Sequence, residues 1–256
     1  MLFVADIGNT NIVIGLYEKD NLVLKSRIVS EPLRTVDEYY LLLERILSLH
    51  NLKPDIIDSG AVSSVVPKCD KVFFELLQSL GVKEPFFINS KVKLNIALDV
   101  ENPEELGADR IVNAVAAYQL YKQDLIIIDF GTATTVDYVS KDGVYKGGLI
   151  LPGYNLMKES LHRKTAKLPD VSFGKTISVL GRNTVENIQN GLFHLKIGGL
   201  ERIVRLIKEE YSLNEVKIIA TGGLACFFSS SLTENTLVEP DLTLKGIKLV
   251  YSLNIT

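Results

Sequence analysis

The chain has 256 residues, of which 46% are hydrophobic and 23% are charged, and its formal net charge at pH 7 is −3. These values are typical of a globular protein with one large or two ordinary domains, and the slight negative charge argues against non-specific nucleic-acid binding, so we expect no nucleic-acid partner. Because no stretch reaches the ~18 apolar residues of a membrane span and the start of the chain lacks the regions of a signal peptide, we expect no membrane contact and a cytoplasmic location.

The first predicted element is an apolar strand over residues 2–5, which runs into the sequence Asp-x-Gly at Asp6. A strand end of this kind lets a phosphate approach the backbone beside the glycine, and the turn amides can bind an anion. Since a carboxylate repels phosphate, Asp6 would hold a cation there. The same residue types also suit a plain hairpin turn, so this segment alone leaves both interpretations open.

The next segments alternate between helix and strand. Apolar residues at helical spacing predict a helix over 36–50 and another over 68–80, which Gly81 would close. Between them, residues 55–63 have the composition of a buried strand. This alternation indicates an α/β fold with mixed sheets.

A helix with a strong start signal precedes the middle of the chain. Asn102 and Glu105 match the spacing of a capping box, and apolar spacing predicts a helix over 108–121. Asp109 and Arg110 would lie in its first turn, where the helix dipole stabilises a carboxylate. Taken alone, the pair fits a capping carboxylate with a surface arginine better than it fits catalytic groups.

The strand and its Asp-x-Gly turn occur twice, since residues 2–13 align without gaps to residues 125–136. In each copy a β-branched strand, a second polar turn and a third strand follow. Chance seldom duplicates such a context, so the second copy at Asp129 favours phosphate binding by both turns. A repeat near half the chain length predicts two similar domains, which we place at 1–117 and 118–256.

The rest of the second half predicts a long helix over 187–211, a strand over 216–220 and a closing helix over 244–254. The strand ends at Gly222 and Gly223. Two glycines at a strand end let the backbone pack against a flat adenine or ribose, although a tight strand-to-helix turn uses them equally.

The order of these motifs resembles the actin, hexokinase and heat-shock ATPase superfamily, and within it the whole chain resembles the type III pantothenate kinases. The resemblance implies an α/β fold of two duplicated ribonuclease-H-like domains, with mixed sheets flanked by helices and an ATP cleft between them. It also implies a homodimeric kinase that uses ATP, Mg²⁺ and K⁺ or NH₄⁺ to convert pantothenate to 4′-phosphopantothenate, the first step of coenzyme A biosynthesis. The segments that carry the resemblance are 6–11, 102–110, 129–135, 147–153 and 240–246.

The resemblance further implies roles for individual residues. Asp109 would be the general base for the substrate hydroxyl, and Arg110 would bind the pantothenate carboxylate. Asp129 would hold the monovalent cation, and Asp6 would hold Mg²⁺ through water. Thr184 would reach pantothenate across a dimer interface, and it also fits the N-cap of the following helix. The residues expected to contact ATP are Asp6, Ile7, Gly8, Asn9, Thr10, Asn11, Thr132, Gly222 and Gly223. The residues expected to contact pantothenate are Gly107, Ala108, Asp109, Arg110 and Thr184.

Two other functions stay open, namely a kinase of another small hydroxyl substrate and a nucleotide-binding regulator without catalysis. An intact set of Asp6, Asp109 and Asp129 counts against the regulator, because a regulator needs no general base. Many members of the family have an aromatic residue nine positions before the catalytic aspartate, where this chain has Val100. That difference concerns the wall of the substrate pocket and leaves the phosphoryl-transfer residues unchanged.

Overall fold

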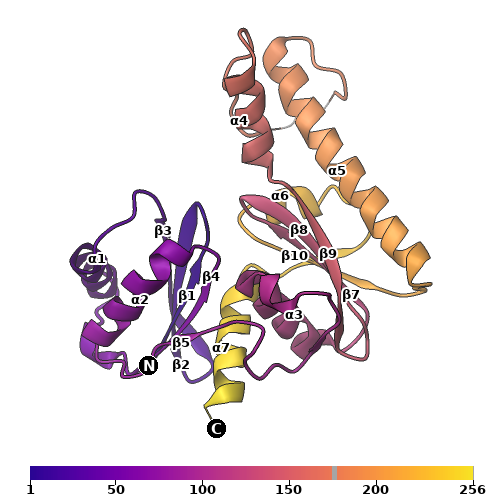
Figure 1. Ribbon diagram of the computed structural model, residues 1–256. Helices are drawn as coiled ribbons and strands as arrows, with labels where there is room; N and C mark the ends of the chain where they lie inside the picture. The colour runs from indigo at the N-terminus through magenta and orange to yellow at the C-terminus, as the bar shows by residue number, and fades with distance from the viewer. Residues whose placement is uncertain (175–177, 256) are drawn as a thin grey trace. The chain divides into compact units, whose positions relative to one another are not determined.

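The computed structural model describes residues 1–174 and 178–255. The chain forms two compact units, one of Met1–Tyr121 with Asp241–Thr256 and one of Lys122–Pro240 (Figure 1). The division differs from the expected domains at 1–117 and 118–256 because the last helix packs with the first unit. No helix in the described part of the chain is long and apolar enough to cross a membrane.

The first unit contains a mixed sheet. The strands between residues 1 and 121 are β1 (Leu2–Ile7), β2 (Asn11–Glu18), β3 (Asn21–Val29), β4 (Ser59–Ser64), β5 (Phe86–Phe87) and β6 (Ala97–Leu98). The strand order is β3-β2-β1-β4-β5, in which β1, β2 and β3 are antiparallel and β4 and β5 continue parallel to β1. The strand expected over 55–63 begins only at Ser59, because the residues from Pro54 to Ile56 form a 3-10 turn instead.

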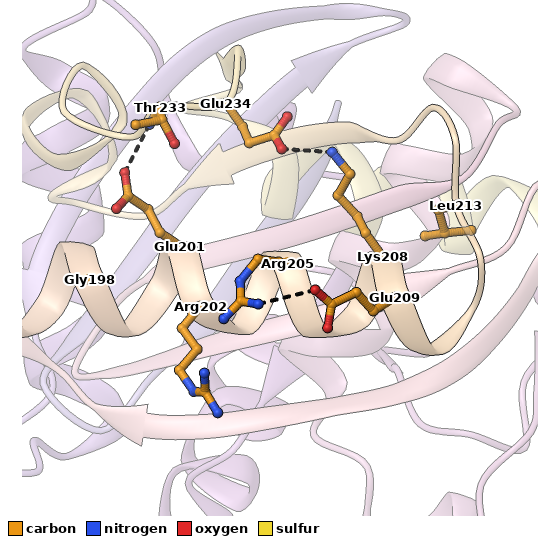
Figure 2. Close-up of a pocket in the computed structure, with 9 residues that line it drawn as sticks. All are labelled: Gly198, Glu201, Arg202, Arg205, Lys208, Glu209, Leu213, Thr233 and Glu234. Carbon is orange, nitrogen blue, oxygen red and sulfur yellow. Dashed lines mark hydrogen bonds and ion pairs between the residues drawn. The ribbon is translucent and has the colours of Figure 1, made fainter.

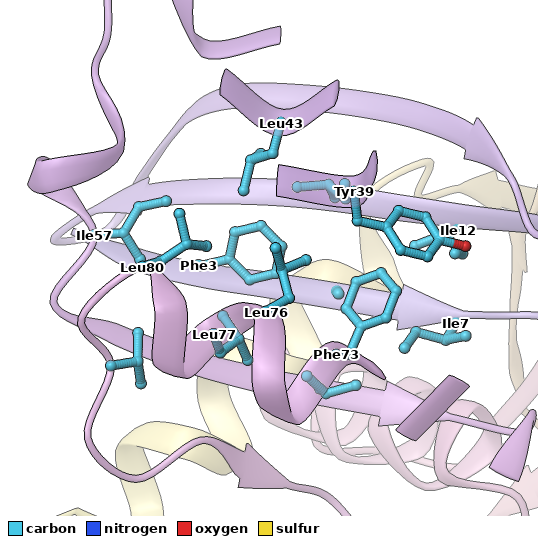
Figure 3. Close-up of a cluster of buried hydrophobic side chains, with 14 of the residues drawn as sticks. Phe3, Ile7, Ile12, Tyr39, Leu43, Ile57, Phe73, Leu76, Leu77 and Leu80 are labelled. Atoms are coloured by element: carbon cyan, nitrogen blue, oxygen red, sulfur yellow. The ribbon is translucent and has the colours of Figure 1, made fainter. Parts of the chain in front are cut away.

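Helices cover both faces of this sheet. They are α1 (Val36–Ser48), α2 (Pro67–Ser79), α3 (Ala108–Tyr121) and α7 (Leu242–Asn254), with the 3-10 turns η1 (Pro54–Ile56) and η2 (Pro103–Glu105). α1 and α2 enclose a core against the face that carries Phe3 (Figure 3). α3 and α7 pack on the opposite face, which by strand alternation carries Val4 and Asp6. A side chain on Gly246 of α7 would overlap the Val112 carbonyl of α3, so the closing helix is docked at close range.

The helices predicted over 36–50, 68–80 and 108–121 are confirmed as α1, α2 and α3, with ends within two residues. The capping box predicted at Asn102 is wrong. Its side-chain amide donates to the Glu105 carboxylate at 3.3 Å, and no side-chain oxygen caps η2 among the described residues. A three-residue 3-10 turn exposes too few amides to form the reciprocal pair of a capping box.

The second unit repeats this plan. Its strands are β7 (Leu125–Phe130), β8 (Ala133–Val139), β9 (Val144–Pro152), β10 (Lys217–Thr221) and β11 (Thr236–Val238). Within the unit their order is β11-β10-β7-β8-β9, with an antiparallel hairpin of β7, β8 and β9 and with β10 and β11 parallel to β7. The helices are α4 (Tyr154–Lys164), α5 (Thr184–Glu210) and α6 (Ala225–Ser229). The stacked rings of Phe130 and Phe228, 5.2 Å apart, join the sheet to α6 in the core of the unit.

The two Asp-x-Gly turns differ in length by one residue. Asp6 pairs with Val13 across the first hairpin, whereas Asp129 pairs with Thr135 across the second. The gapless alignment places Val136 opposite Asp129, so it is wrong within the turn, and the second turn is one residue shorter. Since residues opposite each other on antiparallel strands share a face, Asp129 has a hydroxyl neighbour where Asp6 has an apolar one.

We predict that Phe73→Ala lowers the free energy of unfolding by about 3–5 kcal/mol, because it leaves a cavity in the core of the first unit. The Phe73 ring is fully buried and lies 5.1 Å from the Tyr39 ring (Figure 3). Its neighbour Phe74 is 40% exposed, so Phe74→Ala is the matched control and should cost much less. Urea denaturation of both variants measures the difference, and equal losses would contradict the assignment of this core.

Candidate active site

The first Asp-x-Gly turn is held by hydrogen bonds from one distant serine. The Gly8 N–H donates to the Asn11 carbonyl at 3.0 Å and closes the turn. The buried Ser30 hydroxyl donates to the Gly8 carbonyl at 2.5 Å, and the Ser30 N–H donates to the Thr10 carbonyl at 3.0 Å. Asn9 and Thr10 remain exposed at the tip. Ser30 therefore holds the backbone of the turn on its buried side, while the polar residues at the tip face solvent.

Asp6 is joined to the neighbouring parallel strand. The Ser63 hydroxyl of β4 donates to Asp6 Oδ1 at 3.1 Å. Just beyond Ser63, the Val65 N–H donates to the Ile7 carbonyl of β1 at 3.0 Å. A methyl group of Val65 also lies 3.4 Å from the position that a Cβ on Gly107 would occupy. These contacts bring the first turn and the segment before α3 to the same edge of the sheet.

The first turn of α3 holds Asp109 in a defined orientation. Its Oδ1 accepts the Arg110 N–H at 2.8 Å. A Cβ at position 107 would lie 2.5 Å from the same oxygen, so only glycine there lets the carboxylate fold back over the helix start. Ala108 is buried, whereas Asp109 and Arg110 are half-buried. The dipole of α3 stabilises the Asp109 carboxylate in its charged form.

In the second unit, Asp129 lies directly beside the Gly-Gly motif. Thr221 of β10 pairs with Asp129, and Gly222 follows with φ of +90°, a conformation that L side chains rarely adopt. A Cβ on Gly222 would overlap the Asp129 carboxylate and the Phe130 backbone. Gly223 is exposed next to it. The structure thus brings the second and third predicted motifs together.

The tip of the second turn rests on the end of β9. The Gly153 N–H donates to the Thr132 carbonyl at 3.1 Å, and a Cβ on Gly153 would overlap that oxygen. Thr132 itself is exposed. Behind it, the buried Thr135 hydroxyl has no hydrogen-bond partner among the residues that the structure describes. This oxygen lies on the same face as the carboxylate of Asp129, with which Thr135 is paired.

Thr184 lies elsewhere. It is the first residue of α5 and is exposed, and the beginning of α5 stands away from the sheet of its own unit beside α4 (Figure 1). The alternative interpretation of Thr184 as an N-cap is wrong, since the cap is Asn183, whose side chain accepts the Glu186 N–H at 2.9 Å. Within one chain, the structure does not bring Thr184 to the Asp129 turn.

Comparisons with known proteins agree with these motifs. A family model for type III pantothenate kinase matches residues 2–206. The chain is 41% identical to a type III pantothenate kinase of Syntrophotalea carbinolica and 40% identical to one of Geobacter sulfurreducens, and each match covers 99% of both chains. The chain belongs to the type III pantothenate kinase family. It is therefore an enzyme and a kinase, and the family predicted from the sequence is confirmed.

Solved structures of other proteins share the fold of this kinase at low sequence identity. A protein described as a Baf family transcriptional activator from Campylobacter jejuni has a TM-score of 0.62 at 20% identity, covering 98% of both chains. A protein described as a 2-dehydro-3-deoxygalactonokinase from Sinorhizobium meliloti has a TM-score of 0.57 at 10% identity, covering 98% of this chain and 96% of that one. With the two mixed sheets, these likenesses confirm the predicted fold class.

A surface pocket of the kinase lies along α5, apart from the predicted site (Figure 2). Its three basic and three acidic side chains balance, and two ion pairs cross it, from Arg205 to Glu209 at 3.1 Å and from Lys208 to Glu234 at 2.7 Å. The charges of the side chains that line it therefore sum to zero, so the pocket has no net positive charge to attract a phosphate. The residues that line it are Gly198, Glu201, Arg202, Arg205, Lys208, Glu209, Leu213, Thr233 and Glu234, none of which is a predicted site residue.

Sequence reasoning missed three hydroxyl residues of the kinase, Ser30, Ser63 and Thr135. A polar residue at the end of the otherwise buried strand 55–63 was a signal that could have found Ser63. Thr135 lies within the repeat, but its relation to Asp129 depends on a turn length that the gapless alignment hides. For Ser30 the local sequence has no signal, since it meets the turn only after β3 has folded back.

We predict that Gly222→Ala abolishes most kinase activity, because the new methyl group would strain a backbone at positive φ and displace the Asp129 carboxylate. Gly81→Ala is the matched control, since Gly81 has a similar φ of +94° but nothing lies within 4 Å of the place of its Cβ, and it is no predicted site residue. ADP release and thermal unfolding of both variants provide the measurement. Equal activity of the two variants would contradict the contact between Gly222 and Asp129.

Proposed function

We propose that this kinase transfers the γ-phosphoryl group of ATP to the primary hydroxyl of pantothenate and forms 4′-phosphopantothenate, the first step of coenzyme A biosynthesis. The observation that carries the proposal is the identity of about 40% to type III pantothenate kinases over nearly the whole chain. The orientation of Asp109 at the start of α3 supports it, because phosphorylation of an alcohol needs a base near the attacking oxygen.

In the proposed reaction Asp109 accepts the hydroxyl proton while the pantothenate oxygen forms a bond to the γ-phosphorus. The bond from that phosphorus to the bridging oxygen of ADP breaks, and the electron pair leaves with ADP. Arg110 would bind the pantothenate carboxylate, as its planar guanidinium suits a two-oxygen partner. The polar tip of residues 8–11 and Thr132 would contact the phosphates, and Gly222 and Gly223 would contact the nucleoside.

Asp6 fits a role toward Mg²⁺. In the described part of the chain no three His, Cys, Asp or Glu residues cluster to hold a metal by themselves. Mg²⁺ keeps several waters and is commonly bound by one or two carboxylates together with substrate phosphates, so a single carboxylate held by Ser63 beside the first turn suits it. When bound, Mg²⁺ would neutralise charge on the β- and γ-phosphates.

Asp129 fits a role toward a monovalent cation, K⁺ or NH₄⁺. The support is the Thr135 hydroxyl, a buried oxygen without a hydrogen-bond partner among the described residues, on the same face as the Asp129 carboxylate. A buried hydroxyl left unpaired costs about 1–3 kcal/mol, which a bound cation would offset. The first copy of the turn has Val13 in the corresponding place and offers no such oxygen.

A homodimer and a cytoplasmic location belong to the same proposal. The outer face of α5 carries exposed apolar side chains, Leu195 at 65% and Leu206 at 40% exposure, that a second copy of the chain would cover. Thr184 begins the same helix, so a dimer through α5 would give it access to a partner's substrate, as the family resemblance implies.

We predict that Asp109→Asn lowers kcat by about 10²- to 10⁴-fold while ATP binding persists, because the amide keeps the shape but accepts no proton. Glu104→Gln is the matched control, since Glu104 is an exposed neighbour whose ion pair with Lys91 contributes little. Steady-state rates and ATP titration by calorimetry test both variants. A near-normal kcat in Asp109→Asn would show that another group is the base.

We also predict that Thr135→Val weakens activation by K⁺ and leaves the thermal stability in Na⁺ unchanged or higher, because it removes a buried unpaired hydroxyl at constant shape. Thr134→Val, on the opposite face of β8, is the control and should keep the K⁺ dependence of wild type. The activation constant for K⁺ is the measured quantity. An unchanged constant in Thr135→Val would separate this hydroxyl from the cation site.

The experiment that tests the proposed function is a coupled ADP-release assay with pantothenate, run first in K⁺ and then in Na⁺. Pantothenate-dependent release in K⁺ alone would support both the substrate and the cation. ADP release only with another small alcohol, for example a sugar, would instead indicate a kinase of another small hydroxyl substrate. ATP binding without release on any acceptor would favour the nucleotide-binding regulator.

A further inference from the structure

Lys196 of α5 is a buried lysine to which the phosphoryl-transfer proposal assigns no role. Its side chain is 4% exposed, and its Nζ donates to the Pro152 carbonyl at 2.9 Å. Lysines at protein surfaces bury the aliphatic stem and keep the ammonium group in water, but here the ammonium group is buried as well. The position therefore calls for an explanation other than surface packing.

The burial of Lys196 costs folding stability. Desolvation lowers the pKa of the Lys196 ammonium group from 10.5 to about 8. Because the unfolded chain binds this proton more tightly, the cost is present in full below pH 8 and disappears as the pH rises above 10.5. A fold that retains such a cost at neutral pH commonly does so for function.

The partner of Lys196 connects it to the second Asp-x-Gly turn. The Pro152 carbonyl and the Gly153 N–H belong to one planar peptide group. At its other end, the Gly153 N–H donates to the Thr132 carbonyl at 3.1 Å. A cation on the carbonyl polarises the peptide and strengthens its N–H as a donor. Since a Cβ on Gly153 would overlap the Thr132 oxygen, the turn rests on this peptide without a gap.

We propose that Lys196 is a positioning residue for the second phosphate-binding turn, acting on Thr132 through the Pro152–Gly153 peptide. The ammonium group holds the Pro152 carbonyl in place. The Gly153 N–H of the same peptide then fixes the position and orientation of Thr132 in the turn. The effect on ATP rests on the proposed function, in which Thr132 contacts the phosphates. The effect on the turn itself does not depend on it.

The variant that tests this is Lys196→Met, which keeps the length of the side chain and removes its charge. The expected result is a KM for ATP raised on the order of tenfold, since small displacements of a positioning group have effects of this size or larger. The KM for pantothenate should stay near that of wild type, and the thermal unfolding temperature should stay equal or rise. A merely structural role predicts the opposite pattern, a lower unfolding temperature with both KM values unchanged.

Lys208→Met is the matched control. Lys208 lies on the same helix, but its Nζ pairs with Glu234 at the surface, 2.7 Å away. Both KM values should therefore stay at wild-type levels. A KM for ATP that is unchanged in Lys196→Met, or raised equally in Lys208→Met, would overturn the proposal.

A second measurement separates this inference from the proposed function. In ¹H–¹⁵N spectra of the substrate-free protein, the Gly153 amide should exchange faster with solvent in Lys196→Met than in wild type and in Lys208→Met. Unchanged exchange would overturn the positioning role even if the enzyme proves to act on pantothenate. Absence of pantothenate-dependent ADP release in wild type would instead overturn the function and leave the amide result intact.

Lys196→Gln covers the case in which Lys196→Met fails to fold. Its neutral amide keeps a donor on a shorter side chain and should give a KM for ATP between those of wild type and Lys196→Met. If neither variant folds, Lys196 is a structural residue and the proposal is wrong.

Discussion

A parallel strand beside each hairpin decides how the two Asp-x-Gly carboxylates are held. β4 runs next to β1 and places the Ser63 hydroxyl 3.1 Å from Asp6, while β10 runs next to β7 and places Gly222 against Asp129. A carboxylate at the end of an isolated hairpin would rotate freely in water. With Ser63 hydrogen-bonded to Asp6 and Gly222 packed against Asp129, each carboxylate loses part of that freedom during folding, so less ordering cost remains when a ligand arrives.

Close contact with glycine is the second device in this site. At positions 107, 153 and 222 a side chain would overlap an oxygen of Asp109, Thr132 or Asp129, respectively. A carboxylate or carbonyl that rests on a backbone without a Cβ can move in few directions, because protein interiors have little free volume. These glycines therefore act by allowing an approach, and only Gly222 also has a positive φ.

The two copies of the repeat have the same architecture and different chemistry. One residue fewer in the second turn changes the partner of the aspartate from Val13 to Thr135 and adds a buried oxygen beside Asp129. The supports of the turns differ as well, since a neutral serine hydroxyl holds the first and a buried lysine reaches the second through a peptide group. Duplicated turns can in this way diverge in chemistry while the strands around them stay alike.

The sequence by itself determined the repeat, the identity of the family and five of the helices, but not α4 and α6. Their signals are local: an apolar run into Asp-x-Gly and apolar residues at helical spacing are visible within a window of about 15 residues. Only the tertiary structure decided that Ser63 meets Asp6, that Ser30 shapes the first turn and that Gly222 rests on Asp129, because these partners are tens of residues apart and meet through strand pairing. The same holds for the closing helix α7, whose periodicity predicts a helix but not the sheet that it covers. The length of the two turns lies between these cases. The sequence contains the residues of both turns, but only the strand register shows that the second turn is one residue shorter.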